Sequence, residues 1–182
     1  TGDVVALEYY MDVLGNESAG VLELAYLNSL YHTGVQNHLD EAILRCRQMP
    51  GQKERFEGLA RRHPQLDELP FDYEQRLAGV LVEGEENLLI VKGSLDEVCR
   101  RCSHVEYKGQ RLPMGPDAAA SVHAVADEML EDGMKVLAVA CKPMKGRTAR
   151  PEDMQELTLL GYLAFFDAPK KTAAAAVARL RE

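Results

Sequence analysis

The sequence contains no tryptophan, few cysteines and no long apolar run. Only four cysteines occur in 182 residues, a usage typical of a reducing compartment rather than of a disulfide-stabilised domain. Apolar runs such as those at residues 88–91 and 159–166 have the length of strands. Both fall well short of the ~20 residues that span a bilayer. We therefore expect that this stretch of chain does not enter a membrane.

Basic residues are also in deficit, because 21 lysines and arginines face 29 acidic residues and the formal net charge is −8. A nucleic-acid-binding surface normally shows a basic excess or stripe, so this balance argues against a nucleic-acid partner. An anionic ligand would have to be held by a local cluster of cations that works against the overall charge.

Cys99 and Cys102 form a C-x-x-C pair, a spacing found in zinc and redox sites. A zinc site needs a second pair of cysteine or histidine ligands at matching spacing. The other cysteines, Cys46 and Cys141, are isolated, and the five histidines are scattered singly. We interpret the pair as thiols on one face of a helix at 95–102. We expect no metal site and no catalytic residue in this sequence.

The distribution of apolar residues predicts an α+β domain with an antiparallel sheet and helices packed against it. The composition, 46% hydrophobic and 27% charged, is that of an ordinary globular protein. Apolar residues recur at helical spacing in the segment 17–31, whereas short runs of valine, leucine and isoleucine between turn residues predict strands. Strands are expected at 4–11, 65–71, 76–83, 87–92, 135–141 and 157–166, with a small hairpin around 108–110. Helices are expected at 17–31, 39–46, 52–62, 94–102, 118–131 and from 170 onward.

Two phrases contain the first candidate ligand-binding residues. Phe71 and Arg76 lie in the phrase P-F-D-Y-E-Q-R, and Lys92 and Gly93 end an apolar strand before a helix that Ser94 can cap. Each phrase has an ordinary explanation, namely an edge loop with a core phenylalanine and a strand–turn–helix joint with a solvated lysine. Alternatively, Phe71 offers a stacking face to a purine, Gly93 lets a ligand approach closely, and Lys92 lies at the mouth of a pocket.

Register arithmetic brings these two phrases together. A hairpin that turns at 84–86 pairs residues whose numbers sum to about 169–170. Arg76 then lies roughly opposite Gly93 and beside Lys92, at the end of the hairpin far from the turn. Two cations and Phe71 would gather at one sheet edge of an acidic domain, and like charges need a compensating partner. An anion attached to an aromatic ring would satisfy all three.

Lys135 and Asp40 are further candidates with strong ordinary explanations. Lys135 begins the apolar run 135–141, which is consistent with a central strand that has a cation at its entrance. Asp40 lies near a predicted helix start, where the helix dipole favours acidic residues. The residues alone leave both interpretations open.

Taken in order, these phrases resemble the nucleotide-binding domain of P-type ATPases over nearly the whole chain. The phrases at 25–34 (A-Y-L-N-S-L-Y-H-T-G) and 71–76 (F-D-Y-E-Q-R) are most similar to the magnesium-transporting branch. Thr1 resembles the last residue of the family's D-K-T-G-T-L-T motif, and 160–170 resembles its G-x-x-x-x-x-D-P-P-R segment, with alanine for the first proline and lysine for the arginine. The resemblance implies a nucleotide-binding domain at 1–167 and the start of the phosphorylation domain, as a loosely docked helix, at 168–182.

The resemblance also implies a role for each candidate. Phe71 corresponds to the adenine-stacking phenylalanine, and Arg76 to a basic position beside the nucleotide. Lys92 and the glycine that follows it match the K-G-A motif, which places Lys92 at the base of the adenine pocket. Lys135 corresponds to a basic position that reaches the phosphates, and Asp40 to an acidic residue near the adenine.

The implied function is to hold ATP and its Mg²⁺ for transfer of the γ-phosphate to an aspartate outside this chain. The implied partners are ATP and the phosphorylation and actuator domains of the same protein, at the cytoplasmic face of a bacterial inner membrane. We expect the isolated chain to bind nucleotide and to hydrolyse none. The alternative is an α+β interaction module whose basic edge docks an acidic partner without nucleotide. A complete small enzyme is disfavoured, because the sequence shows no nucleophile–base pair and no phosphate-binding glycine loop.

Overall fold

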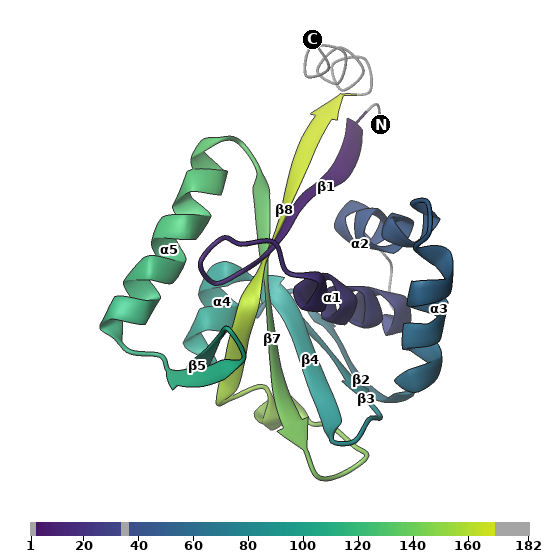
Figure 1. Cartoon of the computed structure of the whole chain (residues 1–182). Coiled ribbons are helices and arrows are strands. Elements are labelled where there is room, and N and C mark those ends of the chain that lie inside the picture. Colours follow the sequence, from purple (N-terminus) through teal and green to yellow (C-terminus); the bar gives the residue numbers. More distant parts are fainter. Residues whose placement is uncertain (1–2, 34–36, 170–182) are drawn as a thin grey trace.

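The long strand β8 (Leu157–Pro169) lies at the centre of the fold. The computed structural model describes residues 3–33 and 37–169, and within them β8 pairs with three other strands (Figure 1). It runs antiparallel to β1 (Asp3–Asp12) and β7 (Lys135–Met144) and parallel to β5 (Cys102–Tyr107). The whole run 157–165 is buried without alternation, as expected for a strand covered on both faces.

The remaining strands complete a mixed sheet in the order β2-β3-β4-β7-β8-β5-β6, with β1 also paired to β8. The α+β class is confirmed, although the β5–β8 pair is parallel and not antiparallel. The reason is that the chain between them returns to the end of the sheet at which β5 begins, where the Leu157 backbone N donates to the Arg101 carbonyl at 2.8 Å. The other strands are β2 (Gln65–Asp72), β3 (Leu77–Val82), β4 (Asn87–Ser94) and β6 (Gln110–Pro113).

The predicted register of the β3–β4 hairpin is confirmed. Leu77 pairs with Gly93 and Val82 pairs with Leu88, and both pairs sum to 170. The small hairpin is confirmed too, because β5 and β6 are joined by a turn at 108–109 in which both residues have positive φ, 49° and 78°.

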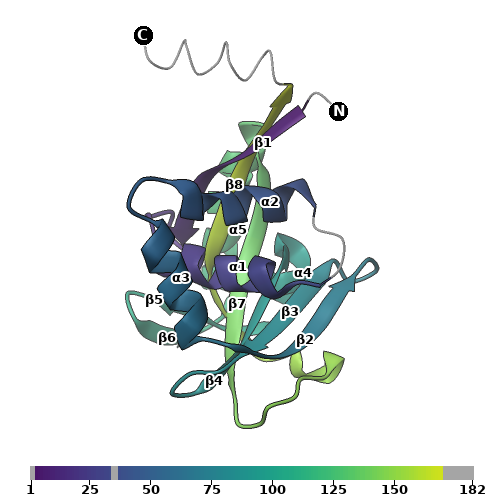
Figure 2. The ribbon, with the colours of Figure 1, turned by 90° about the vertical axis from the view of Figure 1, so that its right-hand side faces the viewer.

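Helices cover both faces of the sheet (Figures 1 and 2). One face carries α1 (Ala19–Tyr31), α2 (His38–Leu44) and α3 (Lys53–Arg62). The other carries α4 (Leu95–Arg100) and α5 (Pro116–Glu131). Two short 3-10 helices, η1 (Arg45–Gln48) and η2 (Pro151–Asp153), lie in the connections.

Alternate residues of β4 belong to two different hydrophobic cores. Ile90 packs with Val80 and Leu163 in the core under α1 and α3. Leu89 and Val91 belong to the core under α4 and α5. Because successive side chains of a strand point to opposite faces, one short apolar strand supports both layers.

Two local expectations are wrong. Cys102 does not share a helix with Cys99, because α4 ends at Arg100 and Cys102 begins β5, where the chain is drawn into the sheet beside β8. Ser94 occupies the N-cap position of α4, but its side chain makes no capping hydrogen bond. Burial raises the pKa of Cys99 to about 11 and that of Cys141 to about 12, so both thiols are protonated near neutral pH.

Both described ends of the chain lie at the same end of the sheet, where β1 and β8 form an antiparallel ribbon (Figure 1). Strand β8 continues past residues 167 and 168, between which the resemblance implies a domain boundary. The helix expected from residue 170 onward lies outside the described residues. In the described part of the chain, no helix is both long and apolar enough to cross a membrane.

Candidate functional site

A cavity of about 640 Å³ opens on the α1–α3 face of the sheet, near the end of β4. It lies where the end of α1, the start of α2, the β2–β3 turn, the end of β4 and the start of β7 meet. Five of the six predicted binding residues line it: Asp40, Phe71, Arg76, Lys92 and Gly93. The remaining lining residues are Asn28, His32, Asn37, Leu39, Pro70, Tyr73, Ala78, Ser94 and Leu137.

Lys92 and Asp40 form the floor of the cavity, and the buried Ser29 contacts both of them. Its Nζ donates to Asp40 Oδ1 and to Ser29 Oγ, both at 2.6 Å, and Ser29 Oγ donates to Asp40 Oδ1 at 2.9 Å. Lys92 and Asp40 are each 6% exposed, and a charge buried to this extent needs a partner inside the protein. The counter-charge of Lys92 is therefore Asp40, which corrects the register argument that a ligand must supply it.

The ionisation of Asp40 follows from these contacts. Burial on its own raises the pKa of Asp40, but Lys92, Ser29 and His32 outweigh it, so the pKa lies below that of a free aspartate. For Lys92, burial lowers the pKa and Asp40 opposes that effect. Asp40 is therefore a carboxylate near neutral pH, held by the ammonium group 2.6 Å away.

Asn28 joins α1 to the sheet beneath the cavity. Its Nδ2 donates to the carbonyls of Ala78 at 3.1 Å and Ile90 at 2.9 Å, and these two acceptors determine which way the amide faces. Its Oδ1 is buried and has no partner among the described residues. Neither Asn28 nor Ser29 is among the binding residues predicted from the sequence. Two adjacent polar residues inside the apolar pattern of the helix predicted at 17–31 are the signal that could have found them.

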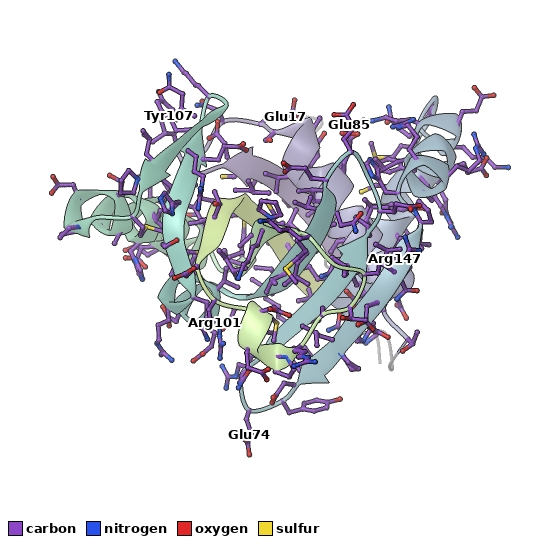
Figure 3. All side chains as sticks on the ribbon, turned by 90° about the horizontal axis from the view of Figure 1, so that it is seen from below. Glu17, Glu74, Glu85, Arg101, Tyr107 and Arg147 are labelled. Carbon is purple, nitrogen blue, oxygen red and sulfur yellow. The ribbon has the colours of Figure 1, made fainter. Side chains whose placement is uncertain are left out.

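Phe71 and Tyr73 form an aromatic wall at the mouth of the cavity. Their ring centroids are 5.0 Å apart and the ring planes meet at 88°. Phe71 is half-buried and keeps part of its ring on the cavity, whereas Tyr73 is 83% exposed. Glu74, at the tip of the same turn, points away from the domain (Figure 3). Tyr73 lies in the phrase P-F-D-Y-E-Q-R but is not among the binding residues predicted from the sequence.

The β2–β3 turn contacts β4 through the backbone of Arg76. Arg76 has a φ of 56°, and its carbonyl accepts a hydrogen bond from the Ser94 backbone N at 3.3 Å. A Cβ atom on Gly93 would lie 2.2 Å from the Arg76 carbonyl oxygen. Position 93 therefore requires glycine because the turn approaches β4 closely, a structural reason that is separate from the predicted approach of a ligand.

Lys135 is the one predicted residue that does not line the cavity. It is exposed at the start of β7, two residues before Leu137, which does line it. Side chains two apart on a strand share a face, so Lys135 lies about 6–7 Å further along the same face. It is placed beyond the cavity and not within it.

At the rim of the cavity, Glu68 on β2 contacts the residues that follow α1. His32 Nδ1 lies 3.4 Å from Glu68 Oε2, and the Thr33 backbone N donates to the same oxygen at 2.8 Å. His32 lines the cavity. Because these contacts join a helix end to a distant strand, no local pattern in the sequence indicates them.

Known proteins are similar in sequence to this chain. A family model described as "P-type ATPase, cytoplasmic domain N" matches residues 11–172, a stretch that includes all six candidate residues. The chain belongs to this family. This N domain is 37% identical to "Magnesium-transporting ATPase, P-type 1" of Escherichia coli K12, over 100% of the chain and 20% of that relative. The protein of the same name from Salmonella typhimurium LT2 is 36% identical over 100% of the chain and 20% of its own length.

Relatives with lower sequence identity are named as calcium transporters. A calcium-transporting ATPase of Listeria monocytogenes is 31% identical over 60% of the chain and 13% of that relative. The chain spans 20% of the length of each of the two magnesium-transporting relatives described above.

Proposed function

We propose that this N domain binds ATP in the cavity and positions it, with Mg²⁺, for phosphoryl transfer in a magnesium-transporting P-type ATPase of a bacterium. The observation that carries the proposal is the gathering of Phe71, Arg76 and the Lys92–Asp40 pair around one cavity of about 640 Å³. That volume lies within the ~300–1,000 Å³ usual for small-molecule sites. The names of the whole-chain relatives support magnesium as the ion.

Each candidate residue takes the role that its place in the cavity suits. Phe71 stacks on the adenine, because every base has a π-face. Lys92 and Asp40 meet the base at the floor, with their charges already balanced. Arg76, exposed at the mouth, and Lys135, further along the same face, compensate the phosphate charge. Gly93 brings the backbone of β4 to the base.

The metal ion belongs to the nucleotide in this proposal. Within residues 3–33 and 37–169 no group of three histidine, cysteine, aspartate or glutamate side chains is arranged to hold a metal ion. Mg²⁺ usually keeps several waters and binds substrate phosphates, so it enters with ATP. The N domain then contributes positioning and charge compensation, which phosphoryl transfer mainly requires of protein. The isolated chain binds nucleotide and hydrolyses none, because the acceptor aspartate lies outside it.

The remaining partners are domains of the same protein. We assign residues 1–167 to the N domain and 168–182 to the start of the phosphorylation domain. The β1–β8 ribbon, which holds both described chain ends side by side, suits two connections to one neighbour. The phosphorylation and actuator domains would lie with it at the cytoplasmic face of the inner membrane.

An amide NMR titration with ATP and then adenosine, taken into the mM range, tests the proposal. We expect saturable shifts at Asp40, Phe71, Arg76, Lys92 and Gly93 with both ligands, and at Lys135 with ATP. Phe71→Ala should weaken both ligands by about 1–3 kcal/mol, the scale of one base–aromatic stack. Lys135→Ala is the matched control, because it should weaken ATP and leave adenosine unchanged. A folded spectrum without localised shifts would refute nucleotide binding.

The interaction module is the weaker alternative. Its basic docking edge would need Lys92 at the surface, yet Lys92 is 6% exposed and paired with Asp40. Arg76 alone then remains of the two clustered cations, and one exposed cation is a poor docking edge on a chain of charge −8.

A further inference from the structure

Tyr73 is the residue at the cavity that neither its packing nor the proposed roles explain. It is 83% exposed, more than any other large apolar side chain that the structure describes. Single exposed tyrosines are ordinary on protein surfaces. This one lines the cavity and contacts Phe71, so its ring stands where a ligand would cover it.

The turn that carries Tyr73 is stabilised by local hydrogen bonds. Asp72 Oδ1 accepts hydrogen bonds from the backbone N of Glu74 at 2.8 Å and of Gln75 at 3.2 Å, and the Arg76 N donates to the Asp72 carbonyl at 2.6 Å. Arg76 adopts the left-handed region, with a φ of 56°, which costs free energy in a residue other than glycine. Such strain persists where the surroundings over-determine the backbone, and it clusters at functional sites. The exposed Tyr73 ring is therefore carried by a turn that has its own hydrogen bonds.

The two aromatic rings meet as two walls of a corner. Their planes are at 88° with centroids 5.0 Å apart, and both rings line the same cavity. A base that lies flat on Phe71 would be nearly perpendicular to the Tyr73 ring and could not stack on it face to face, which leaves Tyr73 to contact a group at the edge of the base. In a nucleoside the bulky group attached to that edge is the ribose.

We propose that Tyr73 packs against the ribose of the bound nucleotide and so orients the base on Phe71. The proposal rests on the proposed function, because it assumes that the cavity holds a nucleotide. The contact is between the ring face and the sugar carbons, and the phenol oxygen is not required. Tyr73 is thus a positioning residue that selects nucleosides over free bases.

A graded series of ligands tests this role. Dissociation constants for adenine, adenosine and ATP are measured by amide shifts for the parent chain, Tyr73→Ala and Tyr73→Phe. Tyr73→Ala should weaken adenosine and ATP by about three- to tenfold, the range that one aromatic contact provides. It should change adenine binding by less than about twofold. Tyr73→Phe is the matched control and should bind all three ligands like the parent.

The outcomes separate this proposal from the one on which it rests. If the parent binds adenosine and Tyr73→Ala binds it with the same affinity, the ribose contact is wrong and the nucleotide site stands. The same conclusion follows if Tyr73→Ala weakens adenine binding as much as it weakens adenosine binding. A loss in Tyr73→Phe equal to that in Tyr73→Ala would assign the effect to the hydroxyl and also refute the ring contact. If the parent binds no ligand of the series, both proposals fail. Because Tyr73 is 83% exposed, its replacement should leave the fold intact, as the amide spectrum of each variant will show.

Discussion

On the α1–α3 face of the sheet four polar side chains are buried around the cavity, namely Asn28, Ser29, Asp40 and Lys92. The core under α4 and α5 is instead built from apolar side chains, and the hydroxyl of its Tyr162 donates to the Val13 carbonyl at 3.2 Å. Most of the difference comes from the helices, because Asn28 and Ser29 lie on α1 and Asp40 lies on α2, whereas Lys92 lies on strand β4.

The buried polar groups on the α1–α3 face contribute less to the stability of the fold than apolar side chains would, but they form part of the candidate binding site. Burial of apolar surface stabilises the fold by about 25 cal/mol per Å². A buried ion pair regains its desolvation cost only with good geometry and further hydrogen bonds. Lys92 and Asp40 meet that condition through Ser29, so the polar face is tolerated and not strongly stabilising. What it provides is a cavity floor whose charges are already in place.

The largest effect should come from breaking the ion pair on one side only. Lys92→Met leaves the Asp40 carboxylate buried without its cation, and we expect a loss of about 3–5 kcal/mol in the free energy of unfolding, measured by urea denaturation. The double variant Lys92→Met/Asp40→Leu is the matched control and should recover most of that loss, because no buried charge remains. Equal instability of the single and double variants would show that packing, and not charge, is what Lys92 contributes.

The apolar face should respond to truncation in a different way. Leu89, on the same strand and 0% exposed, faces α4 and α5. Leu89→Ala should cost about 2–5 kcal/mol of unfolding free energy through lost burial and a new cavity. Nucleotide affinity, titrated at a temperature where the variant is folded, should stay at the parent value. A large loss of affinity in the folded variant would contradict the separation of the two faces.

The smallest effect is the acid response of the polar face. The pKa of Asp40 is lower in the folded than in the unfolded chain, so the unfolded chain binds more protons in that range. The stability that Asp40 contributes is therefore fully present above its unfolded pKa of about 3.9 and is lost as pH falls through the lower folded pKa. Urea midpoints from pH 6 down to about pH 2 should fall less steeply in Asp40→Asn than in the parent. Identical slopes would show that the carboxylate is not held by Lys92.

Much of the fold was predictable because it depends on local patterns. The helices at the N-terminal half, the hairpin register and the small turn at 108–109 follow from apolar spacing and turn residues. The failures are at places where tertiary contacts override the pattern. Cys102 leaves its predicted helix because β5 pairs with β8, and that parallel pairing joins segments more than fifty residues apart.

The candidate site was predictable in its members and not in its chemistry. The short phrases identify Phe71, Arg76, Lys92 and Gly93, and the hairpin register brings their segments together. Register alone could not show that Lys92 is neutralised within the protein, because its partners Asp40 and Ser29 come from helices that the hairpin does not contain. Nor could it show that glycine at 93 makes room for the Arg76 carbonyl.

The sequence by itself determined the class of fold, the pairing of β3 with β4 and the family, since apolar periodicity, turn residues and short ordered motifs are properties of neighbouring residues. Only the tertiary structure decided which side chains face one another across the cavity. That α1 and α2 place Ser29 and Asp40 on Lys92, while Tyr73 stays at the surface beside Phe71, depends on how the helices pack on the sheet. Such contacts join segments far apart in the chain, where burial and charge compensation, and not local propensity, set the arrangement.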